Sequence, residues 1–106
     1  MARNRLNQYR LTLAAQKDME EIWRYGASTW SVHQAELYTD VLEDAFNRLL
    51  TFPELARERT EFTPPVRIYP IGEHIVVYTI ADDHLNVLRI LDGRQDWNSI
   101  LRALDR

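Results

Sequence analysis

The amino-acid sequence predicts an α+β domain in which a pair of helices packs on an antiparallel sheet. Hydrophobic residues recur every three or four positions over residues 13–52, which is the period of a helix, and alternate from residue 66 onward. The later strands are separated by short turns, which require antiparallel pairing. Because the helices precede the strands along the chain, we expect one helical layer on one sheet.

The bulk properties fit one domain spanning residues 1–106. Residues 1–7 are mostly polar and are expected to be flexible. The chain has no cysteine, which excludes disulfides and thiolate zinc sites. Its start lacks the apolar stretch of a secretory signal, and no run approaches the roughly 20 apolar residues of a membrane span. The cytoplasm is therefore the expected location.

A short strand and a first helix are expected near the start. Residues 8–12 alternate, which places Tyr9 and Leu11 on one face of a strand. Thr12 is a typical N-cap for a helix over residues 13–29. The apolar side of this helix is predicted to consist of Ala15, Met19, Ile22, Gly26 and Trp30. The polar side is predicted to consist of Lys17, Asp18, Glu20, Glu21 and Arg24.

A second helix is expected to pair with the first as an antiparallel hairpin. Ser31 and Gln34 have the spacing of a capping box, and Pro53 ends the helix after about Phe52. Its apolar stripe consists of Ala35, Tyr38, Leu42, Ala45, Leu49 and Phe52, widened by Val41, Phe46 and Leu50. We expect Tyr38, Phe46, Leu49 and Phe52 to be core residues. Trp23 and Trp30 fit a core position and an exposed one equally well.

The C-terminal half is predicted to form the sheet and a short helix. After a polar connector over residues 53–65, strands are expected at residues 66–70, 74–80 and 85–91. The central strand is apolar on both faces. Asp96 can cap a last helix, whose apolar face is predicted to consist of Trp97, Ile100, Leu101 and Leu104.

Charge and residue usage favour recognition over lysine-based chemistry. The net charge of −3 argues against a surface that grips nucleic acid all over. Lys17 is the only lysine among 13 basic residues, and arginine suits two-point contacts to carboxylates and phosphates.

The common catalytic and metal-binding motifs are missing from the sequence. His33, His74 and His84 are scattered, and no acidic ladder has the spacing of a calcium loop. The serines lie in no nucleophile elbow, and the glycines, at positions 26, 72 and 93, form no phosphate loop. We therefore expect no metal and no cofactor.

The remaining candidates are polar and aromatic residues on the sheet and directly after it. They are Arg67, Tyr69, His74, Tyr78, Arg89, Arg94, Asp96 and Trp97. Together they predict a basic and aromatic surface that binds a macromolecule. The alternative is structural: Arg89 pairs with a carboxylate such as Asp92 or Asp96, because an unpaired guanidinium is costly to bury, and the tyrosines cover the sheet edge.

Several stretches resemble ParE-type toxins of the ParE/RelE toxin–antitoxin superfamily. They are YRLTLAAQKDMEEIWRY (9–25), Trp30 with QAELY (34–38), LLTFPELAR (49–57), Val66 with Arg67, HIVVY (74–78) and LRILDGRQD (88–96). The resemblance covers about residues 8–97, and the order and spacing of the pieces make it specific. One position departs from the family pattern, because Asp92 stands where such toxins commonly have His.

The resemblance implies a helical hairpin on an antiparallel sheet and a cognate ParD-like antitoxin. For that antitoxin, the candidate binding residues are Trp23, Tyr25, Trp30 and Tyr38. Within the superfamily, ParE-like members poison DNA gyrase and RelE-like members cleave mRNA on the ribosome. DNA would be contacted only through the antitoxin.

The residues favour the gyrase-poisoning alternative over the nuclease. Cleavage of mRNA needs an acid, a base and cations around the scissile phosphate. In the connector, Arg57 and Arg59 lie among glutamates, and neither Tyr nor His follows His84. An inhibitor of gyrase needs a binding surface and no catalytic groups of its own. The alternatives left open are a ribosome-dependent endoribonuclease and a non-toxic relative that acts only in an autorepressor complex.

Overall fold

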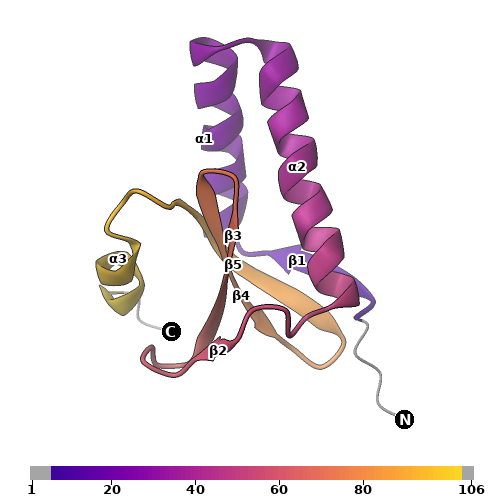
Figure 1. The fold of residues 1–106 in the computed structure, drawn as a ribbon, viewed down its shortest axis with the longest axis vertical. Helices are drawn as coiled ribbons and strands as arrows, with labels where there is room; N and C mark the ends of the chain where they lie inside the picture. Colours follow the sequence, from indigo (N-terminus) through magenta and orange to yellow (C-terminus); the bar gives the residue numbers. More distant parts are fainter. Residues whose placement is uncertain (1–5, 104–106) are drawn as a thin grey trace.

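The computed structural model describes residues 6–103 and confirms the predicted α+β architecture (Figure 1). The elements follow the order β1 (Gln8–Leu11), α1 (Leu13–Thr29), α2 (Val32–Thr51), β2 (Glu58–Arg59), β3 (Val66–Ile71), β4 (His74–Ile80), β5 (His84–Asp92) and α3 (Trp97–Ala103). The hairpin of α1 and α2 projects well beyond the sheet. The short strand β2, inside the connector, was not predicted. No helix in the described residues is long and apolar enough to cross a membrane.

The sheet has the strand order β1-β5-β4-β3-β2 within the described residues. Strands β3, β4 and β5 form the predicted antiparallel meander. Strand β1 pairs parallel to β5, with Tyr9 opposite Leu85. Parallel pairing is possible here because a long stretch of chain, including the helical hairpin, connects the two strands.

Both helices of the hairpin begin at the predicted caps. The Thr12 hydroxyl oxygen accepts a hydrogen bond from the Ala15 N–H at 3.0 Å, and the Ser31 hydroxyl oxygen accepts one from the Gln34 N–H at 3.0 Å. The prediction of a core position for Phe52 was wrong, since its side chain is 59% exposed. Helix α2 ends at Thr51, so Phe52 leaves the helical stripe that would have turned it inward.

The N-terminal prediction needs a partial correction. Residues 1–5 of the segment expected to be flexible lie outside the described residues. Leu6 and Asn7 are tethered: the Leu6 N–H donates to the Leu50 carbonyl at 2.9 Å, and the Asn7 N–H donates to the Asp83 carbonyl at 3.2 Å. Leu6 also packs against the core beneath the hairpin.

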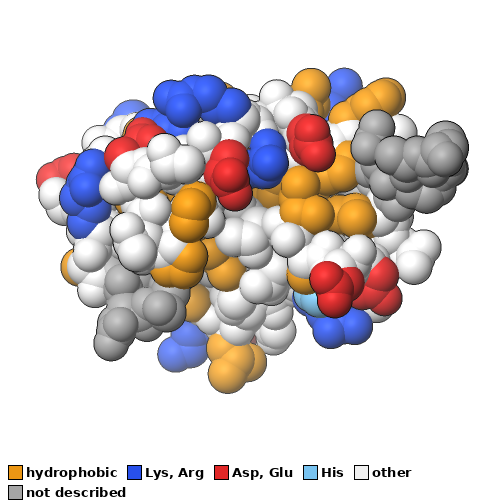
Figure 2. Space-filling view, turned by 90° about the horizontal axis from the view of Figure 1, so that it is seen from below, with side chains coloured by type: hydrophobic (Ala, Val, Ile, Leu, Met, Phe, Trp, Pro, Cys, Tyr) orange, Lys and Arg blue, Asp and Glu red, His pale blue; other side chains and the backbone are white. Residues whose placement is uncertain are grey.

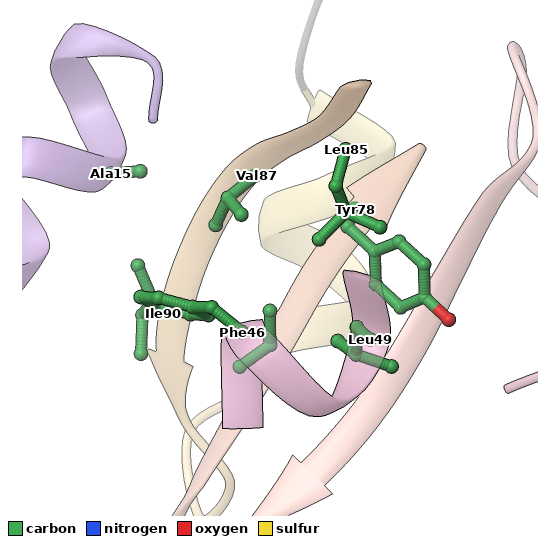
Figure 3. Packing of buried hydrophobic residues seen from close by; sticks show 8 residues of the cluster. Ala15, Phe46, Leu49, Tyr78, Leu85, Val87 and Ile90 are labelled. Carbon is green, nitrogen blue, oxygen red and sulfur yellow. The ribbon is translucent and has the colours of Figure 1, made fainter. Parts of the chain in front are cut away.

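Buried residues line both faces of the sheet. The first core lies between the hairpin and the sheet (Figure 3) and consists of Ala15, Phe46, Leu49, Val76, Tyr78, Leu85, Val87 and Ile90. The second core consists of Phe62, Val66, Ile75, Val77, Leu91 and Leu101. Helix α3 and the connector therefore cover the face of the sheet opposite the hairpin, as the two-sided apolar pattern of β4 requires.

Candidate functional site

Two turns meet at the end of the sheet where β5 leaves it. The turn between β3 and β4 contains Gly72 and Glu73, and residues 93–96 connect β5 to α3. The Gly93 N–H donates to the Glu73 carbonyl at 2.8 Å, and His74 lies opposite Asp92 in the ladder. We call residues 94–97, which begin with Arg94 and end with Trp97, the exit segment. Its position is thus fixed by the neighbouring turn.

Arg94 is exposed but firmly held at this end of the sheet. Its Nε donates to Asp92 Oδ1 at 3.1 Å and its Nη2 to Asp92 Oδ2 at 2.9 Å, while its backbone N–H donates to Oδ1 at 2.8 Å. Glu73 lies 3.6 Å from Nη2, and the Arg94 side chain is 75% exposed. The Arg94 side chain is therefore open to solvent although it is hydrogen-bonded to Asp92.

The opposite charges of Asp92 and Arg94 each stabilise the charged form of the other residue. The guanidinium and the backbone N–H of Arg94 lower the pKa of Asp92 from 3.8 to about 2. The same hydrogen bonds raise the pKa of Arg94 above its ordinary value. Asp92, the residue that departs from the family pattern, serves here to orient the arginine two positions later.

Tyr38 and His74, predicted to belong to two different surfaces, lie together. The Tyr38 hydroxyl is 2.6 Å from His74 Nδ1, and it accepts a hydrogen bond from the Glu73 N–H at 3.2 Å. Burial lowers the pKa of His74, although Asp92 and Glu73 oppose that shift. Burial also raises the pKa of Tyr38. Both rings are therefore neutral near pH 7, and the contact is a neutral hydrogen bond that joins α2 to β4.

Arg89 has a partner that the sequence did not suggest. Its Nε and Nη2 donate to Asp18 Oδ2 and Oδ1 at 2.7 and 2.9 Å, and the Ile90 N–H also donates to Asp18 Oδ2 at 2.9 Å. The structural hypothesis, that Arg89 is paired, is confirmed, but its named partners Asp92 and Asp96 were wrong. The assignment of Asp18 to the exposed side of α1 was also wrong. Asp18 flanks the apolar stripe on the part of α1 that lies against β5.

Three other sheet candidates contribute more to the fold than to the surface. Tyr78 was predicted at a binding surface, yet it is fully buried and donates its hydroxyl to the Pro53 carbonyl at 2.7 Å (Figure 3). That surface position was wrong because β4 is central and the hairpin covers it. Arg67 donates to the Ala56 carbonyl at 2.7 Å, and Tyr69 is partly buried against the first core.

The last two candidates organise α3. Asp96 caps the helix, accepting hydrogen bonds from the N–H and hydroxyl of Ser99 at 3.3 and 2.8 Å. Trp97 packs on the second core together with Ile100 and Leu101, as the predicted helix face requires. Leu104, assigned to the same face, lies outside the described residues.

Cations beside α3 were not recognised from the sequence. The Arg59 guanidinium lies 5.8 Å from the Trp97 ring centroid and 6.0 Å from that of Phe62, and Arg102 lies 5.1 Å from the Phe62 centroid. These distances suit cation–π attraction, which helps to hold the connector to α3. The charge pattern alone gave no signal, since Phe62 and Arg102 lie far apart in the sequence.

Aromatic side chains stand exposed on the helical hairpin. Trp30 is 73% exposed, Tyr25 is mostly exposed, and Trp23 is 37% exposed. Trp30 directly follows α1 at the end of the hairpin that is distant from the sheet (Figure 1). Exposed aromatic residues of this kind are typical of protein–protein contact surfaces.

The opposite end of the molecule has a mixed surface. Figure 2 looks at the end away from the hairpin tip and shows acidic, basic and hydrophobic side chains interspersed. Among the side chains that are described, this view shows no broad basic face of the kind that grips a phosphate backbone. In the described part of the chain, no group of three His, Asp or Glu residues is placed to hold a metal ion.

These features define a small α+β domain with an exposed arginine paired to a neighbouring aspartate and with exposed aromatic residues on its helical hairpin. The family model of the ParE toxin of type II toxin–antitoxin system, parDE, matches residues 9–97. The chain therefore belongs to the ParE toxin family.

Individual relatives agree with this assignment. Toxin ParE1 of Mycobacterium tuberculosis (strain CDC 1551 / Oshkosh) is 34% identical over 91 residues, which cover 85% of this chain and 93% of the relative. Toxin ParE3 of Caulobacter vibrioides is 30% identical over 79 residues, 74% of this chain and 79% of the relative. The fold is similar to a chain in the chromosomal ParDE TA system from P. aeruginosa, with a TM-score of 0.71 at 14% identity, covering 85% of this chain and 98% of that one.

Proposed function

We propose that this ParE-family chain poisons DNA gyrase in the cytoplasm and is neutralised by a ParD-like antitoxin. The observation that carries the target proposal is the geometry of Arg94, which is exposed and yet fixed by Asp92. A guanidinium held in advance loses little freedom when a partner binds, so it is suited to macromolecular recognition. Arginine is also over-represented among residues that dominate binding energy.

The arrangement of polar groups argues against a ribosome-dependent nuclease. His74 is half-buried with Nδ1 against Tyr38, and Arg89 is occupied by Asp18. In the connector, Arg59 is paired with Glu61 at 2.7 Å. General acid–base cleavage of RNA needs such groups close to one another and open to the scissile phosphate. The chemistry of the site is therefore better matched to binding than to catalysis.

The antitoxin is proposed to cover the helical hairpin and to extend the sheet at an open edge. The exposed rings of Trp23, Tyr25 and Trp30 provide the hairpin contact. Strands β1 and β2 are the outer strands of the sheet in the described residues, and an extended segment can add to such an edge through backbone hydrogen bonds. In this proposal the toxin itself does not contact DNA, and the antitoxin makes any contact with DNA.

The decisive experiment compares supercoiling by DNA gyrase with mRNA cleavage on translating ribosomes, using the same purified protein. We expect inhibition of supercoiling and no codon-phased cuts in ribosome-bound message. Cuts with unaffected gyrase would replace this proposal with the nuclease alternative. Inactivity in both assays, combined with tight antitoxin binding, would indicate a non-toxic member of an autorepressor complex.

A further inference from the structure

The hydroxyl of Tyr38 is a junction between α2 and the turn that joins β3 to β4. It lies 2.6 Å from His74 Nδ1, accepts the Glu73 N–H at 3.2 Å and lies 3.5 Å from the Ile71 carbonyl oxygen. Gly72 adopts φ +57 at this point, and a Cβ there would lie 2.7 Å from the same hydroxyl oxygen. The turn is thus fitted closely around one oxygen atom of the helix.

The same turn holds the exit segment from the other side. The Glu73 carbonyl accepts the Gly93 N–H at 2.8 Å, and the Glu73 carboxylate lies 3.6 Å from Arg94 Nη2. His74, the other partner of Tyr38, lies opposite Asp92, which orients the Arg94 guanidinium. A continuous set of contacts therefore leads from Tyr38 through Glu73 and His74 to Arg94.

We propose that Tyr38 is a positioning residue for the exit segment: its hydroxyl sets the orientation of Arg94 through Glu73 and His74 without touching the target. This inference rests on the proposed function in one respect, namely that Arg94 contacts the target. It separates the role of Tyr38 from that of the exposed aromatic residues of the hairpin, because Tyr38 is half-buried and faces the turn.

The first test measures the exit segment in the free protein. Tyr38→Phe removes only the oxygen, and we expect exchange of the Gly93 amide hydrogen to accelerate by about fivefold, the factor expected from losing one ordinary hydrogen bond. The Arg94 Nε–H resonance should shift as well. Central amides of β4, such as that of Val76, should keep their exchange rates. Unchanged Gly93 exchange, or equal acceleration throughout the sheet, would overturn the proposal.

Tyr78→Phe is the matched control for loss of stability. It also removes one phenolic hydroxyl bonded to a carbonyl, but that bond joins β4 to Pro53, away from the exit segment. We expect this variant to lower the melting temperature without accelerating Gly93 exchange selectively. Selective acceleration of Gly93 amide exchange in Tyr78→Phe would show that the exit segment responds to any loss of stability. The proposed positioning role of Tyr38 would then be overturned.

The second test links position to function through a double-mutant cycle. We expect Tyr38→Phe to weaken gyrase inhibition in the parent protein and to have no further effect when Arg94 is already Ala, because both changes act through one guanidinium. Additive losses would overturn the route through Arg94. If Arg94→Ala alone leaves inhibition intact while Gly93 exchange still responds to Tyr38→Phe, the assignment of Arg94 to the target fails and the structural coupling stands.

Discussion

Asp18 and Arg89, 71 residues apart in the sequence, form a two-point ion pair that fastens α1 to β5. The pair lies just beyond the point where β1 stops pairing with β5, beside a register shift between Val77 and Tyr78 in the pairing of β4 with β5. Asp18 also accepts a hydrogen bond from the Ile90 N–H, which lies beyond the last pair between β1 and β5. The carboxylate therefore takes the place of a strand as the partner of this backbone donor. The helix thus completes the sheet edge with a side chain.

Neutralising Asp18 is expected to destabilise the fold. The side chains of Asp18 and Arg89 are 10% and 24% exposed, so Asp18→Asn leaves a poorly solvated guanidinium without its counter-charge. We expect a loss of about 2 kcal/mol in the free energy of unfolding, measured by urea denaturation. Glu20→Gln is the control, because the exposed Glu20–Arg24 pair at 3.9 Å should change stability by less than about 0.5 kcal/mol. Equal effects of the two variants would contradict this interpretation.

The Asp92 carboxyl is expected to titrate at unusually low pH. Its pKa in the folded protein is lowered to about 2 by Arg94, so its contribution to stability is present above the ordinary carboxyl pKa. That contribution is lost as the pH falls from about 4 towards 2. Carboxyl-carbon NMR titration should show this pKa, and Arg94→Gln should return it towards the ordinary value of 3.8. A midpoint that does not move in the variant would show that Arg94 does not cause the shift.

Arg94→Ala is expected to lose toxicity and keep the fold. The side chain is 75% exposed and packs into neither core, so its loss should leave the melting temperature and antitoxin affinity nearly unchanged. Removal of a dominant interface arginine typically costs at least about 30-fold in affinity, and gyrase inhibition should fall by a comparable factor. Arg57→Ala, another exposed arginine, is the control and should remain active. Full activity of Arg94→Ala, or weakened antitoxin binding instead, would show that the exit segment has a structural role and does not contact the target.

Two tryptophans are expected to separate binding from stability. Trp30 is exposed at the end of α1, so Trp30→Ala should weaken antitoxin binding and leave the free energy of unfolding within about 0.5 kcal/mol. Trp97 packs on the second core beside Arg59, so Trp97→Ala should cost about 2 kcal/mol. Calorimetric titration with antitoxin and urea denaturation of both variants provide the comparison. The contrast fails if Trp30→Ala destabilises the fold as strongly as Trp97→Ala.

The local elements could be predicted because their signals are local. Thr12 and Ser31 cap helices through residues three positions away, and the short, nearly continuous apolar run of residues 74–80 indicates a strand with two apolar faces. The same patterns, with the family resemblance, were sufficient for the order of the predicted helices and strands. They did not predict β2, whose two residues carry no periodic signal.

The tertiary structure alone decided which polar residues are free to bind. Asp18 and Arg89 find each other only when α1 crosses β5, and Tyr38 meets His74 only when the hairpin covers the sheet. Tyr78 is buried for the same reason, in agreement with the apolar pattern on both faces of its strand. Residue spacing determines which side chains share a face of one element, because that depends on the helix or strand period. Which element covers that face depends on contacts between distant parts of the chain, and these exist only in the packed domain.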